Sequence, residues 1–73
     1  MSILYEMIFE IKCDLKDNEE IKIEIQEGGS IIRKDDKISC VADILIIVRD
    51  NMETLIPLEK VLRVRRVERF RRD

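Results

Sequence analysis

β-Branched residues dominate the apolar positions of this chain, and they constrain its fold more than any other feature. The sequence holds thirteen Ile and five Val against six Leu and one Ala, with two Gly and one Pro. Branching at Cβ restricts the rotamers of a side chain in a helix and suits the pleated surface of a sheet. The composition therefore predicts a protein built mainly from strands.

Alternation of apolar and polar residues indicates where the first strands lie. From Tyr5 to Cys13 every odd position is apolar and Glu6, Glu10 and Lys12 stand between them, and from Ile21 to Gln26 isoleucine alternates with charged or polar residues. A period of two is typical of a strand with one buried face. We predict a strand in each segment, joined by the polar connection 14–20.

Short polar segments predict the turns that follow. Residues 27–30 contain adjacent glycines, which supply the positive φ of a tight hairpin, so a short strand is expected at 30–33. The sequence KDDK at 34–37 predicts a second turn. The run 44–48 is apolar at every position, which favours a central strand covered on both faces or a strand buried by another copy.

The chain then turns at 49–53 and returns as a strand at 54–56. Pro57 has no backbone N–H to donate, so this strand ends or bulges there. For the last segment two interpretations stay open. We prefer one turn at 58–61 followed by a strand, with Leu62 and Val64 pointing inward and a bulge near 65–66.

The alternative for the last segment is a short C-terminal helix. Pro57 suits a first helical position, and the pairs Glu59/Arg63 and Glu68/Arg72 are spaced for ion pairs along a helix. However, the apolar residues after position 57 spread around the whole helical circumference and leave no single buried stripe.

The segment TLIPLEKVLRVRRV resembles the closing half of small SH3-like and Sm-like β-barrel domains over about residues 38–68. In those domains a strand ending in I-P-L leads through one turn into the last strand. The resemblance implies a small antiparallel, partly open SH3-like barrel, so we predict an all-β fold of five or six strands in one domain spanning residues 1–73. The glycine- and Asn-bearing RNA-binding motifs of Sm proteins are absent, so the resemblance assigns no site residue.

Small size favours self-association. A chain of 73 residues buries only about 60% of its unfolded surface, so its stability is marginal and a homo-oligomer is expected. Charged residues make up 41% of the chain, a proportion that leans towards the composition of heat-loving organisms.

Catalytic and metal-binding chemistry lack their usual residues. The chain has no His, and no Ser or Cys stands beside an obvious base, so we predict no enzymatic activity, no cofactor, no metal and no small-molecule substrate. The acidic residues Asp35, Asp36 and Asp43 are interpreted as solvated turn residues. Cys13 and Cys40 are predicted to be buried and reduced, with a disulfide between adjacent strands as the alternative.

The sequence also predicts a cytoplasmic protein without a membrane partner. Its longest apolar runs are far shorter than a membrane span. The apolar residues near the N-terminus are interrupted by Glu6 and Glu10 and follow no basic region, unlike a signal peptide.

Charge is divided unevenly along the chain. Residues 60–73 carry seven Lys or Arg against two acidic residues, whereas residues 1–59 carry seven against fourteen. The planar fork of arginine suits bidentate contact with phosphate. We therefore predict a binding module that contacts RNA or DNA phosphates, without reading sequence, through the Arg-rich end at about 60–73. Its candidate binding residues are Arg63, Arg65, Arg66, Arg69, Arg71 and Arg72.

The same charge asymmetry is also consistent with a second function. The basic end would instead fold against the acidic surface of its own chain or of a neighbouring subunit. In that case the protein is a protein-interaction or homo-oligomeric assembly subunit.

Overall fold

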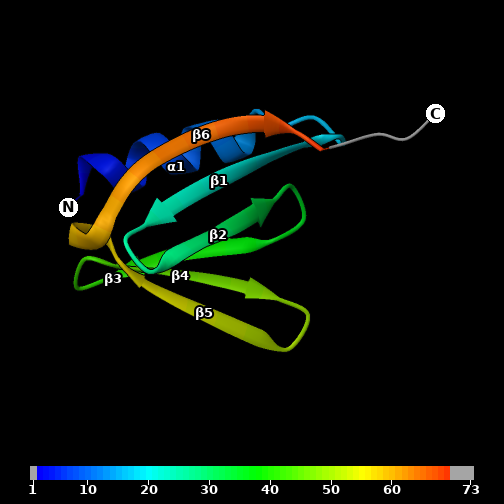
Figure 1. Ribbon diagram of the computed structural model, residues 1–73. Coiled ribbons are helices and arrows are strands. Elements are labelled where there is room, and N and C mark those ends of the chain that lie inside the picture. The colour runs from blue at the N-terminus through cyan, green and yellow to red at the C-terminus, as the bar shows by residue number, and fades with distance from the viewer. Residues whose placement is uncertain (1, 70–73) are drawn as a thin grey trace.

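The computed structural model describes residues 2–69 and shows a helix followed by six strands and one short 3₁₀ turn (Figure 1). The elements in chain order are α1 (Ile3–Cys13), β1 (Glu19–Ile25), β2 (Gly28–Arg33), β3 (Lys37–Val41), β4 (Ile44–Arg49), β5 (Met52–Pro57), η1 (Leu58–Lys60) and β6 (Val61–Glu68).

The fold is α/β, and the predicted all-β, SH3-like barrel is wrong. The strands form two separate open antiparallel sheets, one in the order β2-β1-β6 and the other in the order β3-β4-β5. Within residues 2–69, no strand of one sheet pairs with a strand of the other. The chain crosses between the sheets twice, at the turn after β2 and at η1, and each crossing interrupts the ladder that a closed barrel would need.

The first segment is the helix α1 and not the predicted strand. Its odd-numbered apolar residues do alternate, but Leu4, Ile8 and Ile11 also follow helical spacing, and Ile8 is fully buried. Ser2 caps the helix, because its hydroxyl accepts a hydrogen bond from the backbone N–H of Tyr5 at 3.1 Å. A strand would have turned Ile8 towards solvent, so burial of that residue favours the helix.

The predicted turns are present, but the first hairpin turn lies at another position, and the sequence pattern does not predict the turn at residues 42–43. The first hairpin turns at residues 26–27, and Gly28 and Gly29 begin β2 instead of forming the turn. A Cβ on Gly29 would lie 2.8 Å from the carbonyl oxygen of Ile23, so close strand approach explains that glycine. In the hairpin from β3 to β4, Ala42 and Asp43 both have positive φ, as a two-residue type I′ turn requires.

The C-terminal segment is a strand, and the alternative C-terminal helix is wrong for the residues described. η1 follows Pro57, as expected, and β6 then pairs with β1. The register shifts where Glu24 pairs with Arg63 and Ile25 pairs with Val61, which leaves Leu62 unpaired. The bulge is therefore at Leu62 and not near 65–66, and Leu62 is 70% exposed instead of pointing inward.

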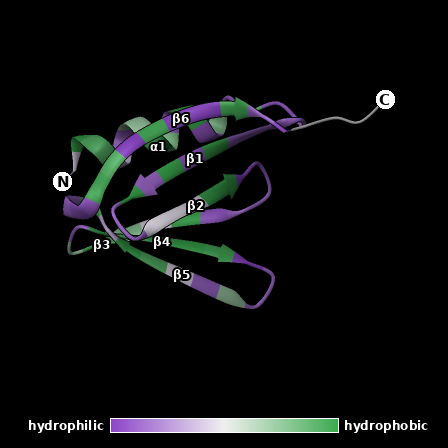
Figure 2. Ribbon diagram, in the orientation of Figure 1, coloured by the Kyte–Doolittle hydropathy of each residue, from purple (hydrophilic) through white to green (hydrophobic). Residues whose placement is uncertain are grey.

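One hydrophobic core lies between the helix and the two sheets. Its centre is Ile8 of α1, Ile21 and Ile23 of β1, and Leu45 and Ile47 of β4. Figure 2 shows β4 as apolar over most of its length, whereas β5 carries polar residues between its ends and β6 alternates between apolar and polar residues. The predicted strand at 21–25 is confirmed, with Ile21 and Ile23 fully buried.

The cysteines only partly match their prediction. Both are free thiols, but Cys13 is exposed at the end of α1, and Cys40 of β3 is half-buried beside the core. The period-two pattern predicts a buried Cys13, but at the end of the helix α1 this residue is exposed.

Candidate nucleic-acid interface

The sheet β2-β1-β6 turns one face to the core and the other to solvent. Ile21 and Ile23 of β1 are buried, so Glu20, Lys22 and Glu24 alternate onto the opposite face. Strand pairing places cations beside these three side chains. Arg33 of β2 pairs with Glu20, and on β6 Arg65 pairs with Lys22 and Arg63 pairs with Glu24.

Two glutamates on this face are each shared by two arginines. The Glu24 carboxylate lies 2.7 Å from Nη2 of Arg65 and 3.7 Å from Nε of Arg63. The Glu20 carboxylate lies 3.4 Å from Nε of Arg33 and 3.5 Å from Nε of Arg69. One negative charge cannot neutralise two guanidinium groups, so the Glu24 cluster keeps an excess positive charge. At the Glu20 cluster, Arg33 and Arg69 also lie near Asp36 and Asp17, which offset that excess.

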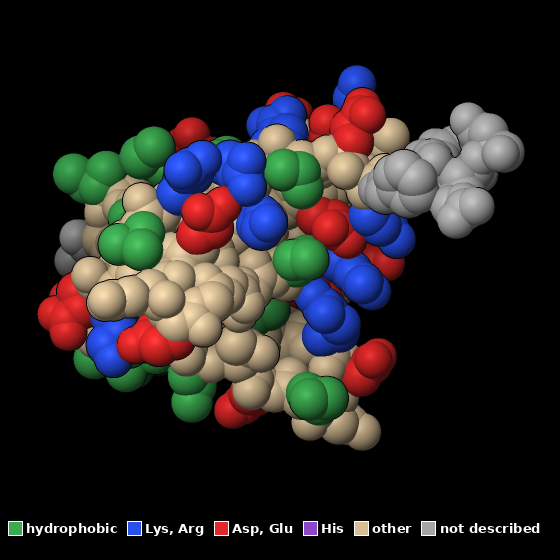
Figure 3. Space-filling view, in the orientation of Figure 1, with side chains coloured by type: hydrophobic (Ala, Val, Ile, Leu, Met, Phe, Trp, Pro, Cys, Tyr) green, Lys and Arg blue, Asp and Glu red, His purple; other side chains and the backbone are tan. Residues whose placement is uncertain are grey.

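Together these side chains form what we call the basic sheet face: Glu20, Lys22, Glu24, Arg33, Arg63, Arg65 and Arg69. Five of its charges are positive and two are negative. Its arginines are about half exposed, whereas the side chain of Glu20 is only 8% exposed beneath them. Figure 3 shows Lys and Arg side chains gathered on this side of the molecule, with acidic side chains among them.

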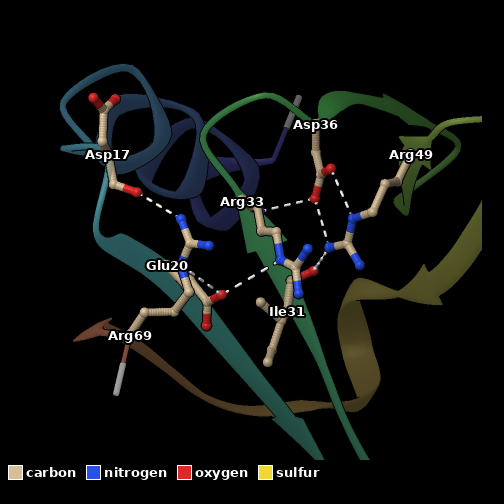
Figure 4. Close-up of polar contacts among 7 residues, drawn as sticks. All are labelled: Asp17, Glu20, Ile31, Arg33, Asp36, Arg49 and Arg69. Carbon is tan, nitrogen blue, oxygen red and sulfur yellow. Dashed lines mark hydrogen bonds and ion pairs between the residues drawn. The ribbon is translucent and has the colours of Figure 1, made fainter. Parts of the chain in front are cut away.

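Backbone contacts fix Arg69 at the end of this face. Its N–H donates to the carbonyl oxygen of Asn18, and its Nη2 donates to the carbonyl oxygen of Asp17, each at 2.6 Å. Figure 4 shows the Arg69 side chain between Asp17 and Glu20, on the same side as Arg33. These contacts hold the guanidinium next to the strands after β6 has ended.

The structure therefore divides the six predicted binding residues. Arg63, Arg65 and Arg69 belong to the basic sheet face. Arg66 points to the opposite side of the sheet, because it pairs with the buried Ile21, and its Nη2 lies 3.5 Å from the carboxylate of Asp14. Arg71 and Arg72 lie outside the described residues.

Sequence reasoning missed Lys22 and Arg33 as members of the same face. The alternation of β1 already places Lys22 opposite the buried isoleucines, so that signal was present in the sequence. Arg33 joins the face only through the pairing of β2 with β1, which no local pattern specifies.

A second charge cluster joins the two sheets. Asp36, only 4% exposed, accepts hydrogen bonds from Nε and Nη2 of Arg49 at 2.9 and 2.7 Å and from the backbone N–H of Arg33 at 2.8 Å. Arg49 also donates to the carbonyl oxygen of Ile31 at 2.8 Å (Figure 4). Burial alone would raise the pKa of Asp36, but these hydrogen bonds and the charges of both arginines outweigh it and lower that pKa below 3.8.

The hollow beside this cluster has balanced charge. It has a volume of about 560 Å³, and four of its lining side chains are basic and four are acidic. A polyanion gains no net attraction from such a lining. Arg33 and Arg69 line this hollow as well as the basic sheet face, so the excess positive charge lies at the other end of that face, where Lys22, Arg63 and Arg65 lie beside the single Glu24.

The described residues meet the requirements of neither a metal site nor a membrane-spanning helix. Residues 2–69 contain no group of three or more acidic or Cys side chains placed to hold a metal ion. α1 is too short to cross a membrane, and no other helix in this range is long and apolar enough.

Comparison with protein-family models, with curated proteins and with solved structures found no match to this chain.

Proposed function

We propose that this protein binds the phosphates of RNA or DNA through the basic sheet face, without reading the base sequence. The observation that carries the proposal is the sharing of each glutamate by two arginines. The face keeps a net positive charge although four of its five cations already have an acidic neighbour.

The geometry suits the phosphate backbone more than the bases. Arginine presents two parallel donors that match two phosphate oxygens, and this face holds four arginines. The aromatic rings within residues 2–69 are Tyr5 and Phe9 of α1, which lie away from this face and pack against each other in a tilted arrangement with their ring centroids 6.2 Å apart. Without a stacking ring the face offers little to distinguish one base from another.

The acidic neighbours predict how affinity can be raised. Glu24→Gln keeps the shape of the side chain and removes the charge that Arg63 and Arg65 share. We expect affinity for a short RNA or DNA to rise several-fold at about 50 mM salt, with a log–log salt slope steeper by roughly 0.7 to 0.9. Fluorescence anisotropy with labelled oligonucleotides, over a series of salt concentrations, measures both quantities.

Glu10→Gln is the matched control. It makes the same change in net charge on the exposed side of α1, behind the sheet. Its effect should be clearly smaller than that of Glu24→Gln. Equal effects of the two substitutions would mean that only total charge matters, and the proposed location of binding would then be wrong.

The reverse test removes cations. Replacing both Arg63 and Arg65 by Gln should flatten the salt slope by roughly 1.4 to 1.8 and weaken binding tenfold or more. The control replaces Lys16 and Lys60 by Gln. These two lysines lie outside the strands of this sheet, and their replacement makes the same change in net charge. If the parent protein binds neither RNA nor DNA at about 50 mM salt, the proposed function is abandoned.

A further inference from the structure

The second sheet, β3-β4-β5, has an apolar face that points away from the core. Leu45 and Ile47 of β4 are buried in the core, so their neighbours Ile44, Ile46 and Val48 point outward. The same alternation holds on the two strands beside β4. We call the whole set the outer apolar face: Lys37, Ser39, Val41, Ile44, Ile46, Val48, Glu53, Leu55 and Pro57.

Large apolar side chains are exposed on this face. Val41 is 61% exposed, Leu55 is 59% exposed and Ile44 is 37% exposed. The apolar side chains of the face together expose on the order of 300 to 400 Å², which is comparable to the largest apolar patch on a typical monomer, a patch that is often functional. This is most of the apolar area that one partner brings to a standard interface of about 800 Å² per side.

Two charges stand on this face, and their positions are complementary. Lys37 on β3 and Glu53 on β5 both pair with Val48, so they lie in one row on opposite sides of β4. A two-fold axis parallel to β4 exchanges the positions of the two outer strands. It therefore brings Lys37 of each copy opposite Glu53 of the other copy, so the dimer contains two such pairs.

We propose that a second copy of this chain binds to the outer apolar face, with the two β3-β4-β5 sheets packed face to face about such an axis. The sheets would lie about 10 Å apart, as in an aligned β-sandwich. Ile44, Ile46 and Val48 then meet their own counterparts, and Val41 lies opposite Pro57. The face is self-complementary, because apolar residues meet apolar residues and Lys37 meets Glu53. An isologous dimer requires such a face, whereas an unrelated partner does not.

This pairing is independent of the proposed phosphate contact. The basic sheet face belongs to the other sheet, so it stays exposed on each copy of the dimer. Self-association is therefore measured without nucleic acid, and failure of one proposal leaves the other standing.

A charge exchange tests the arrangement. Lys37→Glu brings two acidic groups together across the axis, and Glu53→Lys brings two basic groups together. Each substitution should raise the dimer dissociation constant at least about tenfold, and the double exchange Lys37→Glu with Glu53→Lys should restore it to within about threefold. Sedimentation equilibrium over roughly 1 μM to 1 mM protein measures these constants.

Lys16→Glu is the control, because it makes the same charge change as Lys37→Glu at an exposed residue between α1 and β1. It should leave the dimer unchanged, and circular dichroism confirms that every variant is folded. A parent protein that stays monomeric over the whole range overturns the proposal, even if another protein binds this face. A dimer that ignores both single exchanges, or that the double exchange does not restore, overturns the two-fold arrangement.

Discussion

At the scale of single residues, Asp36 holds together parts of the chain that the sequence keeps apart. Its carboxylate accepts hydrogen bonds from Arg49 at the end of β4 and from the backbone of Arg33 at the end of β2. Arg49 in turn donates to the carbonyl oxygen of Ile31. One buried carboxylate thus links the edge strand β2 of one sheet to the central strand β4 of the other, and the guanidinium of Arg49 compensates its charge.

Asp36→Asn should therefore destabilise the protein by about 1.5 to 3 kcal/mol at pH 7, the range for hydrogen bonds to charged groups. The folded state lowers the pKa of Asp36, so the carboxylate contributes stability above about pH 4, the pKa of an unfolded aspartate. That contribution is lost as the pH falls through the lower pKa of the folded state.

Chemical denaturation of both proteins at pH 7 and at several values below pH 4 measures the difference. The parent protein should be the more stable at pH 7, and the gap should narrow as the pH falls. Equal stability of the two proteins at pH 7 would show that the link contributes nothing.

At the scale of secondary structure, β1 organises the sheet that carries the basic face. It is the central strand, and β2 and β6 pair with it on either side. Gly29 allows β2 to lie close enough to β1 for this pairing. The positions of Arg33, Arg63 and Arg65 beside the glutamates depend on the register of these two pairings.

Gly29→Ala tests this dependence. The added Cβ would lie 2.8 Å from the backbone oxygen of Ile23, and a backbone atom moves only with its strand. We expect a loss of about 1 to 3 kcal/mol in the free energy of unfolding, which is typical of overpacking. Ser30→Ala, at the next position of β2, is the control and should cost much less. Thermal melts that agree for the two variants would contradict the close approach.

At the scale of the whole molecule, the two sheets present different surfaces. The outward face of β2-β1-β6 is charged, with a positive excess, and the outward face of β3-β4-β5 is mainly apolar. Because both sheets use their inner faces for the core, the two outer surfaces are free for separate roles. The two functions left open by the sequence are thus compatible in one molecule.

Leu55→Ser tests the separation of these surfaces without changing any charge. It should weaken the dimer at least about tenfold, because it removes an exposed apolar side chain that lies beside Ile46 in the middle row of the interface. Affinity for an oligonucleotide too short to span two copies should change by less than about twofold, since phosphate contacts depend on the cations. Sedimentation and anisotropy measure the two quantities on the same protein. A parallel loss of both would show that the surfaces are coupled.

The sequence by itself determined the features that depend on neighbouring residues. The alternation at 21–25 specified a strand with Ile21 and Ile23 inside, Pro57 ended a strand, and a single turn followed it. The concentration of arginine after position 60 also needs no structure to be seen. Local periodicity and the backbone limits of proline are sufficient for such predictions.

Only the tertiary structure decided the rest, because long-range pairing selects among patterns that are locally equivalent. The segment from Ile3 to Cys13 satisfies both a strand and a helix, and burial of Ile8 against the sheets selects the helix. The predicted inward position of Val64 already places Arg63 and Arg65 on the outer face, but only pairing with β1 brings them beside Glu24 and Lys22, while Arg66 turns towards Asp14. The excess charge of the face likewise arises from two arginines meeting one glutamate across strands, a relation between residues about forty positions apart along the chain.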